Sequence, residues 1–211
     1  MTALDKLATA LNRRDEVLNL ELAEQIVLHN DNAAVKELVD GLGHRDARIR
    51  SDCIKALYEI GARDPSLIAG YLGIFADLLD SRNNRMVWGA MTALDHIAVA
   101  DPEGVYALLD KICATADNGS VITRDHAVGI LTKLASLSRF SDACTLLLIE
   151  QLSACPNNQL PMYAEMSLVV TSSHSRLSLY KVLLDRLAGI EKESQKRRVQ
   201  RVLNRINREF K

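Results

Sequence analysis

The chain of 211 residues is 48% hydrophobic and 25% charged, a composition that excludes disorder and collagen-like structure. Its 26 basic and 27 acidic side chains nearly balance, so it lacks the cationic excess of a dedicated nucleic-acid or anionic-membrane binder. Leu and Ala supply 56 residues, whereas Gly and Pro supply only 14, and we therefore expect an all-helical protein.

The amino-terminal residues predict two helices, over residues 3–12 and about 15–29. The first would place Leu4, Leu7 and Leu11 on one face. No basic stretch followed by an apolar stretch and a cleavage site is present. We therefore expect a cytoplasmic protein without a membrane-inserted segment.

A period of 37 residues organises the chain from about residue 33 onward. The dipeptide Asp64-Pro65 recurs as Asp101-Pro102, and each pair offers a capping oxygen followed by a proline suited to the first helical turn. The same step repeats an apolar stripe with i, i+3, i+4, i+7 spacing. Its positions are Cys53, Ala56, Leu57, Ile60; Ala90, Ala93, Leu94, Ile97; Ala127, Ile130, Leu131, Leu134; and, more loosely, Ala164, Ser167, Leu168, Thr171.

A second apolar stripe precedes each of these, so each unit is predicted to be two helices, A and then B. The A stripes contain Leu38 and Leu42; Leu72, Phe75 and Leu79; Leu109 and Ile112; Leu146 and Ile149. Between A and B, the 37-residue step places Asp46, Asn83, Ser120 and Asn157, whose side chains can cap helix B.

A fifth unit follows at an offset of 38 residues, with Leu184, Leu187 and Ile190 on helix A and Val202 and Ile206 on helix B. We therefore predict a single domain over residues 1–211, with amino-terminal capping helices in residues 1–32. Its repeats would span residues 33–63, 64–100, 101–138, 139–174 and 175–211. Terminal units of such arrays are atypical, because one of their faces meets water.

The segment from Leu42 to Gly61, L-G-H-R-D-A-R-I-R-S-D-C-I-K-A-L-Y-E-I-G, resembles a HEAT repeat. The residues that carry the resemblance are Asp46, Ile49, Arg50, Ala56, Leu57, Ile60 and Gly61. The similarity covers roughly residues 34–211 and is strong in two units. It implies a right-handed α-solenoid of about five helical hairpins, whose B helices line a concave groove and whose usual activity is scaffolding by binding a protein.

Candidate groove residues lie opposite the B-helix stripe. At 100° per residue, positions 51, 55, 58 and 62 face away from it, and 37-residue steps extend the set. The rows are Ser51, Lys55, Tyr58, Ala62; Trp88, Thr92, Asp95, Val99; Asp125, Gly129, Thr132, Ser136; and Met162, Met166, Val169, Ser173. Accessible Trp and Tyr are typical binding anchors, and Met adapts to varied partners. The alternative is that these rows pack against loops or neighbouring units.

We accordingly interpret the groove as a binding site for a peptide or protein, with Trp88 as anchor. The other residues that we assign to it are Lys55, Tyr58, Asp95, Asp125, Met162 and Met166.

Charge is uneven along the chain. Residues 1–190 hold 18 basic and 24 acidic side chains, whereas residues 191–211 hold eight basic and three acidic ones. The final helix should bury Val199, Val202, Leu203, Ile206 and Phe210 and present a basic outer face. This face comprises Arg197, Arg201, Arg205 and Arg208. Such a face is most often solvated, but it can also dock an acidic protein, a nucleic acid or a membrane surface.

No catalytic motif, metal-ligand spacing or cofactor signature is found, so we assign no catalytic residue, no metal and no cofactor. The four cysteines contain no C-x-x-C pair and are expected to be reduced structural thiols. The predicted function is a non-catalytic scaffold for a protein or peptide partner. The oligomeric state remains open.

The alternative is a HEAT-like DNA-binding protein or an alkylpurine DNA glycosylase-like enzyme. That family presents Trp and Asp in a basic channel, and Trp88 and Asp95 do share a helical face. However, the predicted rows contain one Lys, no Arg and two Asp, whereas binding several phosphates requires a cluster of cations.

Overall fold

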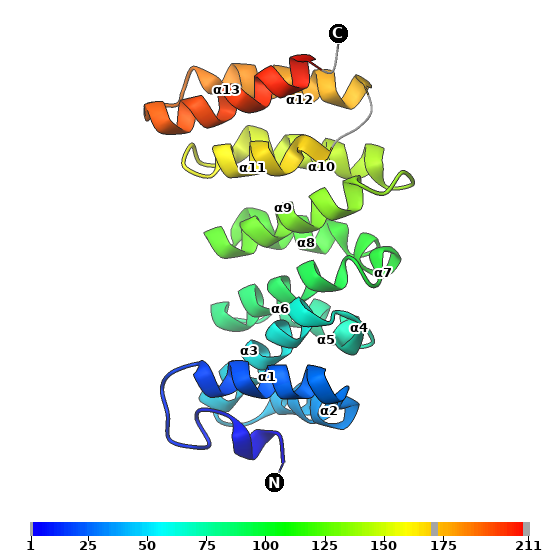
Figure 1. Cartoon of the computed structure of the whole chain (residues 1–211), viewed down its shortest axis with the longest axis vertical. Helices are drawn as coiled ribbons and strands as arrows, with labels where there is room; N and C mark the ends of the chain where they lie inside the picture. The colour runs from blue at the N-terminus through cyan, green and yellow to red at the C-terminus, as the bar shows by residue number, and fades with distance from the viewer. Residues whose placement is uncertain (1, 170–172, 209–211) are drawn as a thin grey trace. The chain divides into compact units, whose positions relative to one another are not determined.

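The computed structural model describes residues 2–169 and 173–208, and all regular structure within them is helical (Figure 1). The predicted all-α architecture of helical hairpins is confirmed. The chain divides into two compact units, unit 1 (Met1–Ala127) and unit 2 (Val128–Lys211).

Unit 1 has two layers of helices. Its elements are the single 3-10 turn η1 (Leu4–Lys6), α1 (Val17–His29), α2 (Asn32–Asp40), η2 (Gly41–Gly43), α3 (Ala47–Arg63), α4 (Ser66–Ala69), α5 (Leu72–Leu78), α6 (Asn84–Ile97), α7 (Pro102–Tyr106), α8 (Leu109–Asn118) and the first half of α9 (Val121–Ala135). Helix α3 packs between α1 and α6 in one layer, while α2 packs on α3 and α5 packs on α6 from the other layer.

Unit 2 consists of the second half of α9 and two hairpins. Its remaining elements are α10 (Ser141–Ala154), α11 (Leu160–Met166), η3 (Ser167–Val169), α12 (Ser173–Leu187) and α13 (Glu193–Arg208). Helix α10 packs on α12, and α13 packs on both α11 and α12.

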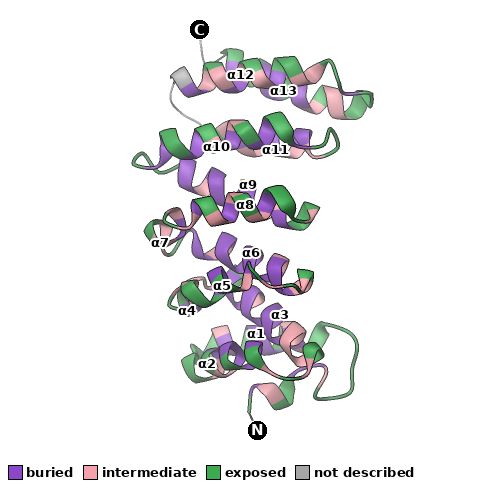
Figure 2. Cartoon of the chain, turned by 180° about the vertical axis from the view of Figure 1, so that it is seen from behind, coloured by how far each residue is buried: buried purple, intermediate pink, exposed green. Residues whose placement is uncertain are grey.

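The predicted B-helix stripe forms the core. From Cys53 to Leu134, every one of its positions is fully buried, and the burial follows α3, α6 and α9 (Figure 2). In the fourth unit Ala164 and Ser167 are buried and Leu168 is half-buried, while Thr171 lies outside the described residues.

Three of the four predicted caps are confirmed. The side chains of Asp46 and Asn83 accept hydrogen bonds from the amides of Arg48 and Arg85, at 2.8 and 3.0 Å. The Ser120 hydroxyl accepts one from the Thr123 amide at 3.3 Å. The prediction for Asn157 is wrong, because its side chain donates to the Gly189 carbonyl and accepts from Arg186 instead.

The predicted helix over residues 3–12 is also wrong. Only Leu4–Lys6 is helical, as a single 3-10 turn. The side chain of Asn19 accepts a hydrogen bond from the Ala8 amide, and the side chain of Asp52 accepts one from the Thr9 amide. These two amides therefore donate to side chains rather than to backbone carbonyls of a helix. Asn12 then adopts φ 55°, in the left-handed region that ends helical turns.

Two predicted A helices are each divided in two. The second repeat has α4 and α5 before α6, and the third has α7 and α8 before α9. At both breaks the backbone hydrogen bonds change to the 3-10 pattern, in which an amide donates to the carbonyl three residues back. The Tyr71 amide donates to the Ile68 carbonyl, and the Leu108 amide donates to the Val105 carbonyl. These repeats therefore contain three helices rather than two.

The predicted A stripe of the fourth unit has the wrong register. Leu146 is 64% exposed, and its counterpart Leu184 in the fifth unit is 47% exposed. Cys144 and Leu148 are buried instead. The run from Leu146 to Ile149 places apolar side chains around the whole helix, so local periodicity does not identify the buried face.

Candidate functional site

The candidate site lies where α3 and α6 pack side by side in unit 1. We define the α3–α6 face by Lys55 and Tyr58 of α3 and Trp88 and Asp95 of α6. Lys55 and Tyr58 are each 8% exposed and Asp95 is 9% exposed, whereas Trp88 is only half-buried. The aromatic surface of Trp88 is therefore the most accessible part of this face.

Tyr58 and Trp88 form an aromatic pair. Their ring centroids are 5.9 Å apart and their planes are inclined by 50°. The Lys55 ammonium lies 4.9 Å from the centroid of Tyr58, and the Arg85 guanidinium lies 5.1 Å from the centroid of Trp88. Both distances fall within the range of cation–π attraction, so two cations support the aromatic pair.

Glu16, in the loop before α1, joins these cations. One carboxylate oxygen lies 3.2 Å from Nζ of Lys55, and the other accepts a hydrogen bond of 2.8 Å from Arg85. Lys55 also donates to Glu59 at 2.8 Å, and Arg63 donates to the second oxygen of Glu59 at 2.8 Å. We call Glu16, Lys55, Glu59, Arg63 and Arg85 the charged cluster. Each of its three cations has a carboxylate partner.

These contacts shift the pKa values of the charged groups. The hydrogen bond from Arg85, followed by the contact with Lys55, lowers the pKa of Glu16. Burial acts to raise the pKa of Glu59, but Lys55 and Arg63 outweigh it and leave that pKa lowered. Burial likewise acts to lower the pKa of Lys55, yet Glu59, Tyr58 and Glu16 raise it overall. The cluster is therefore held in its charged form at neutral pH.

Asp95 of α6 contacts α9, and Asp125 belongs to α9 itself. A carboxylate oxygen of Asp95 is 2.9 Å from Nδ1 of His126, which ties α6 to the first half of α9. Asp125 is half-buried on the same part of α9. Asp95 is thus both nearly buried and engaged with a neighbouring side chain.

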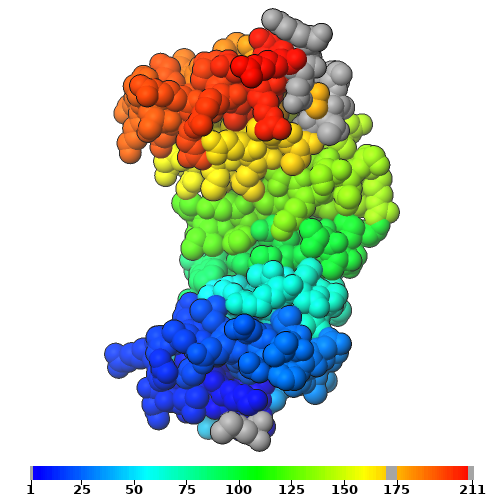
Figure 3. Space-filling view, viewed as in Figure 1, coloured from blue at the N-terminus to red at the C-terminus, as the bar shows by residue number. Residues whose placement is uncertain are grey.

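An open hollow of about 720 Å³ adjoins the cluster, and both Glu16 and Arg85 contribute to its wall. The rest of the wall comes from the loop before α1 and the first turns of α3, and it includes Arg13, Arg14 and Arg48. The loop projects from the surface at the left of the space-filling view (Figure 3). A chain crossing Trp88 could therefore continue into a polar, accessible hollow.

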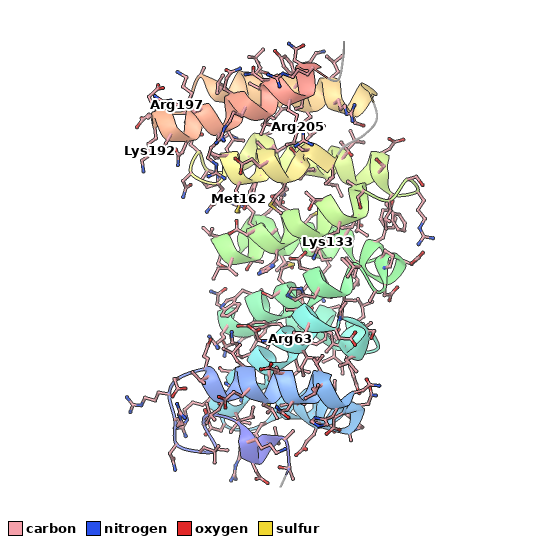
Figure 4. The ribbon with its side chains drawn as sticks, viewed as in Figure 1. Arg63, Lys133, Met162, Lys192, Arg197 and Arg205 are labelled. Carbon is pink, nitrogen blue, oxygen red and sulfur yellow. The ribbon has the colours of Figure 1, made fainter. Side chains whose placement is uncertain are left out.

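The other predicted residues belong to unit 2. Met162 and Met166 are half-buried on α11. Arg197, Arg201, Arg205 and Arg208 are all exposed on α13, where Figure 4 labels Arg197 and Arg205. The apolar side chains Val199, Val202, Leu203 and Ile206 are buried as expected, and Phe210 lies outside the described residues.

Sequence reasoning missed four members of the cluster, namely Glu16, Glu59, Arg63 and Arg85. The i, i+4 spacing of Lys55, Glu59 and Arg63 could have indicated the ion pairs on α3. Arg85 lies three residues before Trp88 on one helical face. The link from Glu16 to Arg85 spans 69 residues and has no local signal.

Two further observations concern other kinds of site. In the described part of the chain, no three His, Cys, Asp or Glu side chains are grouped so that they could hold a metal ion. Among the same residues, no helix has the length and apolar character needed to cross a membrane.

Comparisons with known proteins show the fold. No family model matches the sequence, and a search of the curated proteins finds no match. A designed armadillo repeat protein in complex with the peptide (KR)4 superposes with a TM-score of 0.66 at 16% identity, over 87% of this chain and 85% of that chain. A computationally designed armadillo repeat protein for modular peptide recognition gives 0.65 at 15% identity, over 87% and 85%. An engineered protein gives 0.61 at 18% identity, over 98% and 97%.

The chain has the fold of an armadillo- or HEAT-like α-solenoid. HEAT repeats contain two helices and armadillo repeats contain three. The first repeat, α2 and α3, has the two-helix form, whereas the second and third have the three-helix form.

Proposed function

We propose that this protein is a non-catalytic scaffold that binds an extended or helical peptide segment of a protein partner on the α3–α6 face. The observation that carries the proposal is the Tyr58–Trp88 pair, which is held by Lys55 and Arg85 while Trp88 remains partly accessible. An aromatic side chain that is rigidly supported yet accessible can bury a partner's apolar side chain at little entropic cost. Met162 and Met166 on α11 are proposed as a second contact surface in unit 2.

The solved structures support this reading at the level of architecture. One designed armadillo repeat protein is bound to a peptide, and another was designed for modular peptide recognition. We also propose that the chain is a cytoplasmic adaptor related to HEAT-repeat proteins. Its repeats would be residues 33–63, 64–100, 101–138, 139–174 and 175–211, capped by residues 1–32.

The charge pattern argues against DNA binding or glycosylase chemistry on this face. Lys55, Arg63 and Arg85 are each paired with Glu16 or Glu59, so the charge of these three cations is already neutralised and is not free to bind phosphates. Asp95 is nearly buried and bonded to His126, so the carboxylate that shares the helical face of Trp88 is poorly accessible. A charge-balanced aromatic face fits a protein partner better.

The proposal is tested by selecting binders from a random peptide library with the wild-type protein. Each selected peptide is then titrated against wild type, Trp88→Ala and a control, Tyr180→Ala, which removes a half-buried aromatic ring from α12. We expect Trp88→Ala to weaken binding at least tenfold, since central aromatic anchors are worth about 2 kcal/mol or more. Tyr180→Ala should leave the affinity unchanged.

Thermal unfolding of each variant separates lost binding from lost structure. Selected peptides that bind wild type and a folded Trp88→Ala variant equally well would contradict the proposal. Failure to select any peptide on the α3–α6 face would also count against it.

A further inference from the structure

Unit 2 is cationic, although the whole chain is nearly neutral. It contains 13 basic and seven acidic side chains, a net charge of +6, whereas unit 1 contains 13 basic and 20 acidic ones, a net charge of −7. Helix α13 alone, Glu193–Arg208, has six basic side chains and one acidic. The positive charge is thus concentrated on one element.

Packing fixes which face of α13 is turned outward. Its apolar side chains, Val199, Val202, Leu203 and Ile206, are buried against α11 and α12. Arg198 reinforces this orientation with two hydrogen bonds to the Glu165 carboxylate of α11, at 2.9 and 2.6 Å. The opposite face is held in solvent.

The outward face carries cations that form no ion pair with the described residues, although Arg201 lies close enough to Glu165 to assist Arg198 in lowering the pKa of that carboxyl. Arg197, Arg201 and Arg208 are exposed, and within residues 2–169 and 173–208 none of them has a carboxylate within ion-pair distance. Unlike Arg198, these three guanidinium groups form no hydrogen bond with the described residues, so their donors can bind an external anion.

The side chains between these arginines are polar. Gln200 and Asn204 are exposed and hydrogen-bonded to each other at 3.1 Å. With Ser194, Arg197 and Arg201 they line a shallow hollow of about 540 Å³ that contains no apolar side chain. This composition matches the side chains that commonly contact phosphate groups.

Two other occupants fit this face less well. A membrane-surface helix needs an exposed apolar face, but the apolar face of α13 is buried in the protein. A protein interface is normally centred on aromatic or aliphatic anchors, and the hollow offers none. A polyanion with regularly spaced charges requires only the arginines and the amides.

We propose that the outer face of α13 binds the phosphate backbone of a nucleic acid, without reading its base sequence. Arg197 and Arg201 are one helical turn apart, about 6 Å along the axis, and Arg208 lies roughly two turns further. Each strand of a duplex presents one charge per ~3.4 Å of axis, so long arginine side chains can reach separate phosphates. This site is independent of the proposed peptide site in unit 1.

The test measures fluorescence anisotropy of a labelled DNA duplex and of a single-stranded RNA of the same length, over a series of salt concentrations. The variant carries Arg197→Ala, Arg201→Ala and Arg208→Ala. The control carries Lys6→Ala, Arg45→Ala and Arg82→Ala, which remove three exposed cations of unit 1 and change the net charge equally. Thermal unfolding of both proteins checks that they remain folded.

We expect the α13 variant to bind at least tenfold more weakly than wild type, while the control stays within about twofold. For the duplex, the slope of log affinity against log salt should fall by up to about 0.9 for each arginine removed. The stronger of the two ligands identifies DNA or RNA as the natural class.

Three results would overturn the proposal. The first is that wild type binds neither nucleic acid at low salt, and the second is that the control loses as much affinity as the α13 variant. The third is that a polyglutamate peptide of matched charge binds as tightly as the nucleic acids and depends on the same arginines, which would indicate an acidic protein partner.

Discussion

At residue 16, one carboxylate joins cations that come from two different helices. Glu16 contacts Lys55 of α3 and Arg85 of α6, and these are the cations that lie over Tyr58 and Trp88. Lys55 is almost buried, so the loss of its acidic partners would leave a poorly solvated charge. Glu16 and Glu59 therefore keep the aromatic pair in place as well as neutralising charge.

The stability provided by this cluster should depend on pH. The pKa values of Glu16 and Glu59 are lowered from 4.5, so their contribution is present above pH 4.5 and is lost as the pH falls through the lowered values. The pKa of Lys55 is raised from 10.5, so its contribution is present below pH 10.5 and is lost as the pH rises through the raised value. The full contribution therefore lies between these limits.

We predict that the double variant Glu16→Gln, Glu59→Gln has a lower free energy of unfolding than wild type at neutral pH. The difference should shrink as the pH falls below 4.5, because wild type then loses the same charges. Urea unfolding across this range measures it. Glu21→Gln with Glu24→Gln, two exposed positions of α1, is the matched control. A deficit that does not change with pH would contradict the account.

At the scale of elements, close packing of α3 and α6 depends on Gly89. A Cβ at this position would lie 2.6 Å from Cγ1 of Ile54, a fully buried, β-branched residue of α3 with little freedom to move. Gly73, in α5, has no atom within 4 Å of its Cβ position. Alanine substitutions at these two glycines therefore distinguish the effect of helix propensity on stability from the effect of packing.

We predict opposite effects for the two alanine substitutions. Gly73→Ala should stabilise the protein, by up to about 1 kcal/mol, because alanine favours the helix. Gly89→Ala gains the same propensity but should destabilise the protein, because overpacking costs about 1–3 kcal/mol. Chemical unfolding of both variants checks this, and a stabilised Gly89→Ala protein would show that α3 and α6 can separate at little cost.

Much of this arrangement was predictable from periodicity. The B stripe and the caps at Asp46, Asn83 and Ser120 depend on local spacing, so the sequence alone indicates them. The segment before α1 was not predictable, because its conformation depends on side chains of Asn19 and Asp52 that are distant in sequence. The break between α7 and α8 occurs at Ala107 and Leu108, where no Gly or Pro marks it.

The candidate site was only partly predictable for the same reason. Helical spacing and the 37-residue step predicted that Lys55 and Tyr58 of one helix and Trp88 of the next lie on one surface. The same reasoning overestimated the exposure of Lys55 and Tyr58. Glu16 completes the cluster through a contact across 69 residues, which no local pattern encodes.

At the scale of the whole molecule, charge is divided between the units, with a net charge of −7 in unit 1 and +6 in unit 2. Opposite charges of this size on different parts of one chain favour attraction between molecules when screening is weak.

We therefore predict weak self-association at low ionic strength, reversed above about 0.1 M salt, where the Debye length falls below about 10 Å. Light scattering of the purified protein measures the apparent mass. The triple alanine variant of Arg197, Arg201 and Arg208 should associate less than wild type, because it lowers the positive charge of unit 2. An apparent mass that does not depend on salt would show that the charge division has no such effect.

The most direct test of peptide binding uses Trp88 itself, because it is the only tryptophan in the chain. Tryptophan emission is recorded while a selected peptide without tryptophan is added, and accessibility is probed with a neutral quencher. If the peptide covers Trp88, its emission should shift to shorter wavelength and quenching should decrease, with a midpoint equal to the independently measured dissociation constant. A peptide that saturates the protein without changing the emission or the quenching of Trp88 would contradict the proposed role of the α3–α6 face.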